Sequence, residues 1–132
     1  MRALVPALIA AAAVAGCGNM ERSDEPASAP ADTTRLTVTV TEAAPDPIRI
    51  ELRCGGEEPC DRAQLRKLER VTKAEDPTQA CTLVYGGPER ARVTGTLEGE
   101  TVDVTVTRSD GCGIADYEEL FVALGRKPPL DG

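Results

Sequence analysis

The chain has 132 residues, with 22 acidic side chains against 15 basic ones and a net charge of −7. This balance argues against nucleic-acid binding and against a basic patch for membrane lipids. The sequence contains no histidine and no nucleophile motif of the Gly-x-Ser-x-Gly kind, so it offers neither an acid–base pair nor an activated nucleophile. We therefore expect a binding protein, not an enzyme, with no metal and no cofactor.

Residues 1–16 have the features of an export signal: a basic start and an apolar run too short to span a bilayer. The run ends in Val14-Ala15-Gly16-Cys17, which resembles the bacterial lipobox, whose cysteine receives a diacylglyceryl group. We expect a lipid on Cys17 that anchors the chain to the cell membrane on its extracytoplasmic side. The alternative is an ordinary signal peptide that leaves Cys17 free. Residues 17–34, rich in Ser, Pro, Ala and acidic side chains, form a predicted disordered linker.

Residues 35–125 are expected to form one small domain, followed by a flexible tail over residues 126–132. Near its start, residues 36–41 and 48–53 alternate between apolar and polar side chains. A period of two is typical of half-buried strands, so these segments predict an antiparallel pair.

A helix and a hairpin follow along the chain. Asp61 and Gln64 have the spacing of a capping box, and the helix that they predict ends before Asp76-Pro77. Its apolar side consists of Leu65, Leu68 and Val71. Beyond it, residues 91–97 and 101–108 alternate in the same way as the first pair and meet around Glu98-Gly99. This is the clearest hairpin signal in the chain.

Five cysteines minus the lipidated one leave Cys54, Cys60, Cys81 and Cys112, an even number in an exported domain. Four thiols allow three disulfide pairings, and the sequence does not choose among them, although Cys54 and Cys60 flank a turn-rich segment that could close locally. A zinc site is the weaker reading, because histidine and a Cys-x-x-Cys spacing are both missing.

Between the helix and the hairpin lies a short apolar run, Ala80-Cys81-Thr82-Leu83-Val84-Tyr85, which begins next to a cysteine. Turn-forming residues flank it, which favours an exposed loop. The alternative is that Leu83-Val84-Tyr85 is the start of a buried strand.

The order Cys81-x-Leu83-Val84-Tyr85, then Pro88, then a Val/Thr-rich hairpin and Cys112 resembles the Streptomyces subtilisin inhibitor family. The resemblance extends from about residue 36 to residue 124. It implies an α+β fold, with an antiparallel sheet of about five strands, two helices packed on one side, and disulfides Cys54–Cys60 and Cys81–Cys112. Residues 114–124 also fit a helical stripe. The family pattern implies a short helix and then a final strand through about residues 120–124, and we expect a strand over residues 121–124.

The resemblance also implies a function. The chain would inhibit an extracellular serine protease, subtilisin-like or chymotrypsin-like, by the substrate-like standard mechanism. The reactive bond would join Leu83 to Val84, and Leu83 would enter the primary specificity pocket of the protease. The remaining contact residues would be Cys81, Thr82, Tyr85 and Gly86. Pairing through the sheet into a homodimer is left open.

Two features favour a different function for the same fold. Thr82 and Gly86-Gly87 replace stiffer residues of the family pattern, and glycine raises the freedom of a loop. The alternative is a non-inhibitory envelope lipoprotein that binds another surface protein. A carrier or structural lipoprotein is a third possibility.

Overall fold

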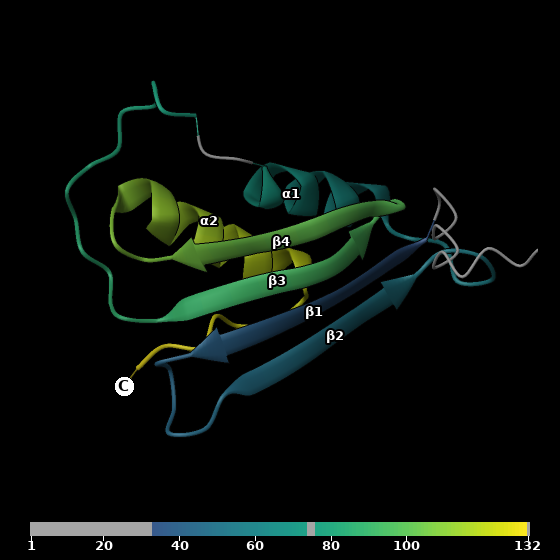
Figure 1. The fold of residues 1–132 in the computed structure, drawn as a ribbon, viewed down its shortest axis with the longest axis horizontal. Coiled ribbons are helices and arrows are strands. Elements are labelled where there is room, and N and C mark those ends of the chain that lie inside the picture. Colours follow the sequence, from purple (N-terminus) through teal and green to yellow (C-terminus); the bar gives the residue numbers. More distant parts are fainter. Residues whose placement is uncertain (1–32, 74–75, 132) are drawn as a thin grey trace, which may run out of the picture.

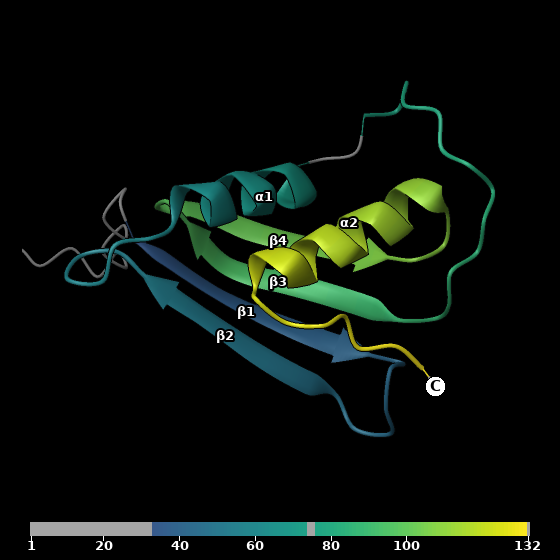
Figure 2. The ribbon, with the colours of Figure 1, turned by 180° about the vertical axis from the view of Figure 1, so that it is seen from behind.

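The computed structural model describes residues 33–73 and 76–131. Four antiparallel strands form one sheet in the order β2-β1-β3-β4, and two helices cover one of its faces (Figures 1 and 2). The strands are β1 (Thr34–Thr41), β2 (Ile48–Cys54), β3 (Arg90–Leu97) and β4 (Glu100–Thr107). The helices are α1 (Arg62–Thr72) and α2 (Gly111–Ala123). The predicted α+β class is therefore confirmed. Cys17, the predicted signal peptide over residues 1–16 and the predicted linker up to residue 32 lie outside the described residues.

None of the helices within the described ranges is both long enough and apolar enough to cross a membrane.

The predicted alternation along the first two strands is confirmed. Leu36, Val38 and Val40 of β1 are buried, while the threonines between them are partly exposed. Val38 lies opposite Ile50 of β2 and Val93 of β3, which are buried as well. The β-branched side chains of the three strands thus form one apolar face, on which the helices pack.

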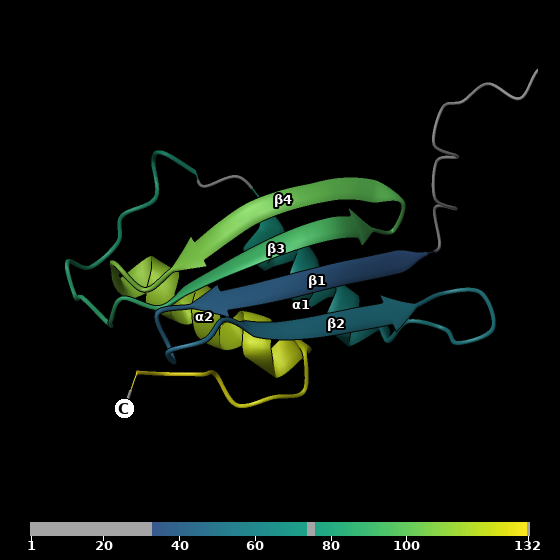
Figure 3. The same cartoon turned by 60° about the horizontal axis from the view of Figure 1, so that its bottom comes forward.

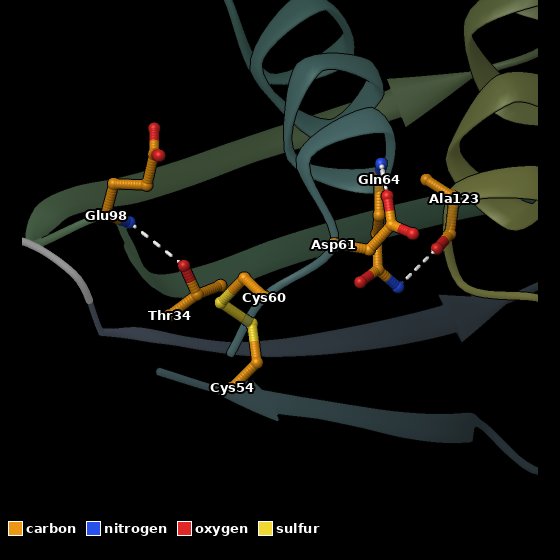
Figure 4. Close-up of a disulfide and its surroundings, with 7 residues drawn as sticks. All are labelled: Thr34, Cys54, Cys60, Asp61, Gln64, Glu98 and Ala123. Atoms are coloured by element: carbon orange, nitrogen blue, oxygen red, sulfur yellow. Dashed lines mark hydrogen bonds between the residues drawn. A yellow bond between two sulfur atoms is a disulfide. The ribbon is translucent and has the colours of Figure 1, made fainter. Parts of the chain in front are cut away.

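Helix α1 begins where the sequence predicts, but only half of the capping box forms. The Asp61 side chain accepts a hydrogen bond from the Gln64 backbone N–H at 3.0 Å, an arrangement worth about 1 kcal/mol of stability. The Gln64 side chain does not return to the cap. Its amide donates to the Ala123 carbonyl at 2.6 Å, so it joins α1 to the last turn of α2 (Figure 4).

The expected fifth strand over residues 121–124 is wrong, because the chain is helical from Gly111 to Ala123. Tyr117, Leu120 and Phe121 all become fully buried against the sheet, and their spacing suits one face of a helix. Asp110 caps the N-terminus by accepting the Gly113 N–H at 2.8 Å. At the other end, Gly125 has a φ of +66° and the Arg126 N–H donates to the Phe121 carbonyl at 2.9 Å. This Schellman ending reverses the chain.

Two predicted boundaries shift. Thr34, which we assigned to the linker, is the first residue of β1 and is fully buried, and its hydroxyl accepts the Glu98 N–H at 3.1 Å (Figure 4). Residues 126–131, which we expected to be a flexible tail, run back along the sheet after α2 (Figures 2 and 3). Two of them, Pro129 and Asp131, make hydrogen bonds to the domain.

Candidate functional site

The exposed loop, residues 76–89, connects α1 to β3 and passes around the N-terminal end of α2 (Figures 1 and 2). It begins with a turn in which the Asp76 carboxylate accepts hydrogen bonds from the Thr78 hydroxyl at 2.6 Å and the Thr78 N–H at 2.9 Å. These bonds lower the pKa of Asp76. The bond from the Thr78 N–H to the Asp76 side chain closes an Asx turn at the start of the loop.

Three apolar residues form the apolar tip of this loop: Leu83, Val84 and Tyr85. Their exposed fractions are 98%, 57% and 67%. Since apolar side chains of this size are usually buried, three consecutive exposed ones point to a binding role. The alternative reading of these residues as a buried strand start is wrong.

Both sides of the apolar tip are anchored to the turn between β4 and α2. Before the tip, the Thr82 carbonyl accepts the Gly111 N–H at 2.9 Å. After it, the Gly86 N–H donates to the Arg108 carbonyl at 2.7 Å. The Cys81–Cys112 disulfide, with a Cα–Cα distance of 5.3 Å, fixes the chain one residue earlier. Only three residues therefore extend between the two hydrogen-bonded anchors.

Glycines allow these close approaches. A Cβ atom at Gly111 would collide with the Thr82 hydroxyl, and a Cβ atom at Gly86 would lie 2.6 Å from Cγ1 of Ile114. The sequence suggested that glycine at position 86 loosens the far side of the loop. In the structure the main chain of this residue is hydrogen-bonded and packed against α2, so it forms the second anchor.

A buried ion pair lies under the far side of the loop. The Glu89 side chain is 2% exposed, and its carboxylate accepts hydrogen bonds from the Arg108 guanidinium at 2.8 Å and the Asp131 N–H at 2.7 Å. Burial alone would raise the pKa of Glu89, but these donors outweigh burial and lower it. Gly87, with a φ of +143°, crosses directly above the pair, where a Cβ atom would strike the carboxylate.

Tyr117 completes this network from α2. Its hydroxyl donates to the Pro129 carbonyl at 2.7 Å, and the Arg108 guanidinium lies 5.7 Å from its ring centre. Burial, helped by the negative charge of Glu89, raises the pKa of Tyr117 to about 12. The network thus links β4, α2, the exposed loop and residues 129–131.

The raised pKa of Tyr117 predicts a loss of stability in alkali. The folded-state pKa exceeds the ordinary value of 10.0, so the stability that the neutral phenol contributes is complete below pH 10 and is lost as the pH rises towards 12. At pH 11 the loss should be about 1 kcal/mol relative to pH 9. Urea unfolding at both pH values measures it, with Tyr117→Phe as the control that removes this contribution. A tyrosinate band at 295 nm that forms near pH 10 in folded Tyr85→Phe protein would contradict the prediction.

The structure brings most of the predicted site residues together. Cys81, Thr82, Gly86, Cys112 and the apolar tip lie in one place, and the pairing Cys81–Cys112 is confirmed. The other disulfide, Cys54–Cys60, is also confirmed but lies at the far end of β2, at the opposite end of the sheet (Figures 1 and 4).

Glu89, Arg108 and Gly111 were not among the site residues predicted from the sequence. The hairpin register could have revealed the first two, because Arg90 pairs with Thr107 and the next positions outward are Glu89 and Arg108. No sequence pattern could have revealed Gly111, because glycine is needed there only since Thr82, which is distant in the sequence, packs closely against it.

Asp110 lies beside Cys81 and Cys112, and together they have the residue types of a metal site. The two sulfur atoms are bonded to each other, and the Asp110 carboxylate accepts the Gly113 N–H as a helix cap. This cluster is therefore structural.

Comparison of the chain with protein-family models, with curated proteins and with solved structures gives no match.

Proposed function

We propose that this protein is a serine protease inhibitor of the substrate-like standard mechanism, directed at subtilisin-like proteases, with Leu83–Val84 as its reactive bond. The observation that carries the proposal is the apolar tip. It is exposed to solvent, with Leu83 almost completely open, yet it is anchored one residue before Leu83 and two residues after Val84. A protease binds substrate as an accessible, ordered segment of this length. Because the ordering cost is met before association, a segment that is already held binds tightly.

The anchors also explain how cleavage would stay reversible. Attack of the protease serine on the Leu83 carbonyl gives an acyl-enzyme and frees the Val84 amine. The Thr82 carbonyl remains bonded to Gly111, and the Gly86 N–H remains bonded to Arg108. The amine therefore stays beside the acyl group at a high effective concentration, and re-formation of the peptide bond competes with water.

Specificity would follow from Leu83, which is 98% exposed and can enter a protease pocket without disturbing the domain. A branched apolar side chain suits the hydrophobic pockets of subtilisin-like and chymotrypsin-like enzymes. A trypsin-like pocket contains a buried carboxylate, which leucine would leave unpaired. The complex should have the usual interface size of its class, about 1,600 Å².

Location at the cell envelope is part of the proposal. Two disulfides suit an oxidising extracytoplasmic compartment, and a lipid on Cys17 would hold the domain near the membrane surface. The partner would then be a protease that acts at or outside the envelope.

Titration of subtilisin with the Cys17→Ser protein, which lacks the lipid acceptor, tests the function. Protease activity should fall linearly to zero near one inhibitor per enzyme, and mass spectrometry should find only traces of a cut, located between Leu83 and Val84. Full protease activity at large excess of the protein, or its rapid digestion, would contradict inhibition. Either result would favour the non-inhibitory lipoprotein that binds another surface protein.

A further inference from the structure

The segment after α2 contacts the same residues that anchor the exposed loop. Gly125, with its φ of +66°, ends the helix and turns the chain back. Residues 126–131 then run towards the end of the sheet where the loop enters β3 (Figures 1 and 2). There the Pro129 carbonyl accepts the Tyr117 hydroxyl and the Asp131 N–H donates to Glu89. We refer to residues 125–131 as the strap.

Glu89 is placed to transmit this contact to the loop. One carboxylate oxygen accepts from the strap and the other accepts from Arg108. The main-chain carbonyl of the same Arg108 accepts the Gly86 N–H, the anchor that follows the apolar tip. Two residues, Glu89 and Arg108, therefore connect the strap to the Gly86 anchor of the loop.

Both side chains that connect the strap to the loop are largely buried, so neither can move freely. The side chain of Glu89 is 2% exposed and that of Arg108 is 12% exposed. A buried carboxylate that loses one donor has little water to replace it, so it must shift or recruit water from outside. Gly87 lies against both members of the pair, so a shift of the carboxylate moves the loop backbone directly.

We propose that Glu89 is a positioning residue for the proposed reactive loop, and that the strap, through the Asp131 N–H, holds it in place. This inference rests on the proposed inhibitory function for its consequence, since a loosened Gly86 anchor lets the Val84 amine drift away after cleavage. Loss of the strap contact would turn a slowly cut inhibitor into a faster substrate without unfolding the domain.

Asp131→Pro in the full-length Cys17→Ser protein tests the inference, because proline lacks the N–H that donates to Glu89. The matched control is Asp131→Ala, which removes the same side chain and keeps the N–H. Two quantities are measured: amide hydrogen exchange at Gly86 in the free protein, and the rate at which subtilisin cuts the Leu83–Val84 bond. Exchange at Val38, in the centre of β1, reports global stability.

We expect Asp131→Pro to raise Gly86 exchange and bond hydrolysis by about tenfold each, the effect of losing one hydrogen bond to a charged group. Asp131→Ala should change neither Gly86 exchange nor bond hydrolysis. In Asp131→Pro, exchange at Val38 should rise by no more than about tenfold, because the lost hydrogen bond also lowers the free energy of global unfolding. Gly86 should still exchange faster than Val38, since its anchor opens locally. Unchanged exchange at Gly86, or exchange at Gly86 as slow as at Val38, would overturn the inference.

The exchange readout needs no protease, so it separates the two proposals. Faster Gly86 exchange in a protein that does not inhibit subtilisin would support the strap and refute the inhibitor. Tyr117→Phe is a second variant, which releases the Pro129 carbonyl by removing a hydroxyl and nothing else. It should also raise Gly86 exchange, and no change there would count against the strap.

Discussion

Removal of the Cys81–Cys112 disulfide by the double substitution Cys81→Ala/Cys112→Ala should convert the proposed inhibitor of subtilisin into a substrate. The bond closes a segment with a sequence separation of 31 residues. In the chain-entropy account its loss costs between about 3 and 4 kcal/mol of stability. It also frees Cys81 and weakens the anchor at the neighbouring Thr82, at about 1–2 kcal/mol of ordering for each of these two residues. Hydrolysis at Leu83–Val84 should then accelerate by about 100-fold.

The second disulfide provides a matched control. Cys54–Cys60 has a sequence separation of 6 residues, so Cys54→Ala/Cys60→Ala should cost only about 2 kcal/mol. Because that bond lies at the opposite end of the sheet, inhibition of subtilisin should not change. Urea unfolding gives the stability of each variant, and mass spectrometry of mixtures with catalytic subtilisin gives the rate of cleavage. Equal acceleration in both double variants would mean that stability, and not the anchor, controls cleavage.

Leu83→Lys should redirect the proposed inhibitor from subtilisin towards trypsin. The lysine ammonium would pair with the buried carboxylate of the trypsin pocket, which leucine leaves unpaired, and we expect a gain in trypsin affinity of about 100-fold or more. Affinity for subtilisin should fall by about tenfold, as a charged head group meets an apolar pocket. Inhibition constants for both enzymes measure the change.

Stability should stay the same in Leu83→Lys, because the side chain that it replaces is 98% exposed. Val122 offers a control, since it is an apolar residue on α2 that is 58% exposed and lies outside the loop. Val122→Lys should leave both inhibition constants unchanged. A Leu83→Lys protein that keeps its subtilisin affinity and gains none for trypsin would show that Leu83 does not enter the specificity pocket.

Sequence patterns predicted helices and strands best where the structure depends on residues that are close together in the chain. The alternation in residues 36–41 depends only on which side of a strand each residue faces, and it is confirmed. The α1 start at Asp61 is confirmed for the same reason. The expected strand at residues 121–124 failed because the family resemblance was preferred to the helical spacing of Tyr117, Leu120 and Phe121. That local spacing was the better guide.

The parts that sequence analysis missed depend on contacts between distant segments. Gln64 has the position of a capping residue, and only the approach of α2 gives its side chain a better partner in Ala123. Glu89 looks like one more surface carboxylate in an acidic chain. It becomes buried because Arg108 lies opposite it across the hairpin and because the strap folds back over it. Nothing in residues 126–131 taken alone predicts that return.

The most direct test of the account is re-formation of the cut bond. Protein that has been cleaved quantitatively between Leu83 and Val84 would be incubated with a catalytic amount of subtilisin, and intact protein would be measured by mass spectrometry over time. If the Gly111 and Arg108 anchors hold both new ends in place, intact protein should reappear. The final ratio of intact to cut chain should be the same whether the incubation starts from cleaved or from intact protein. Cleaved protein that stays cleaved, or is digested further, would contradict the account.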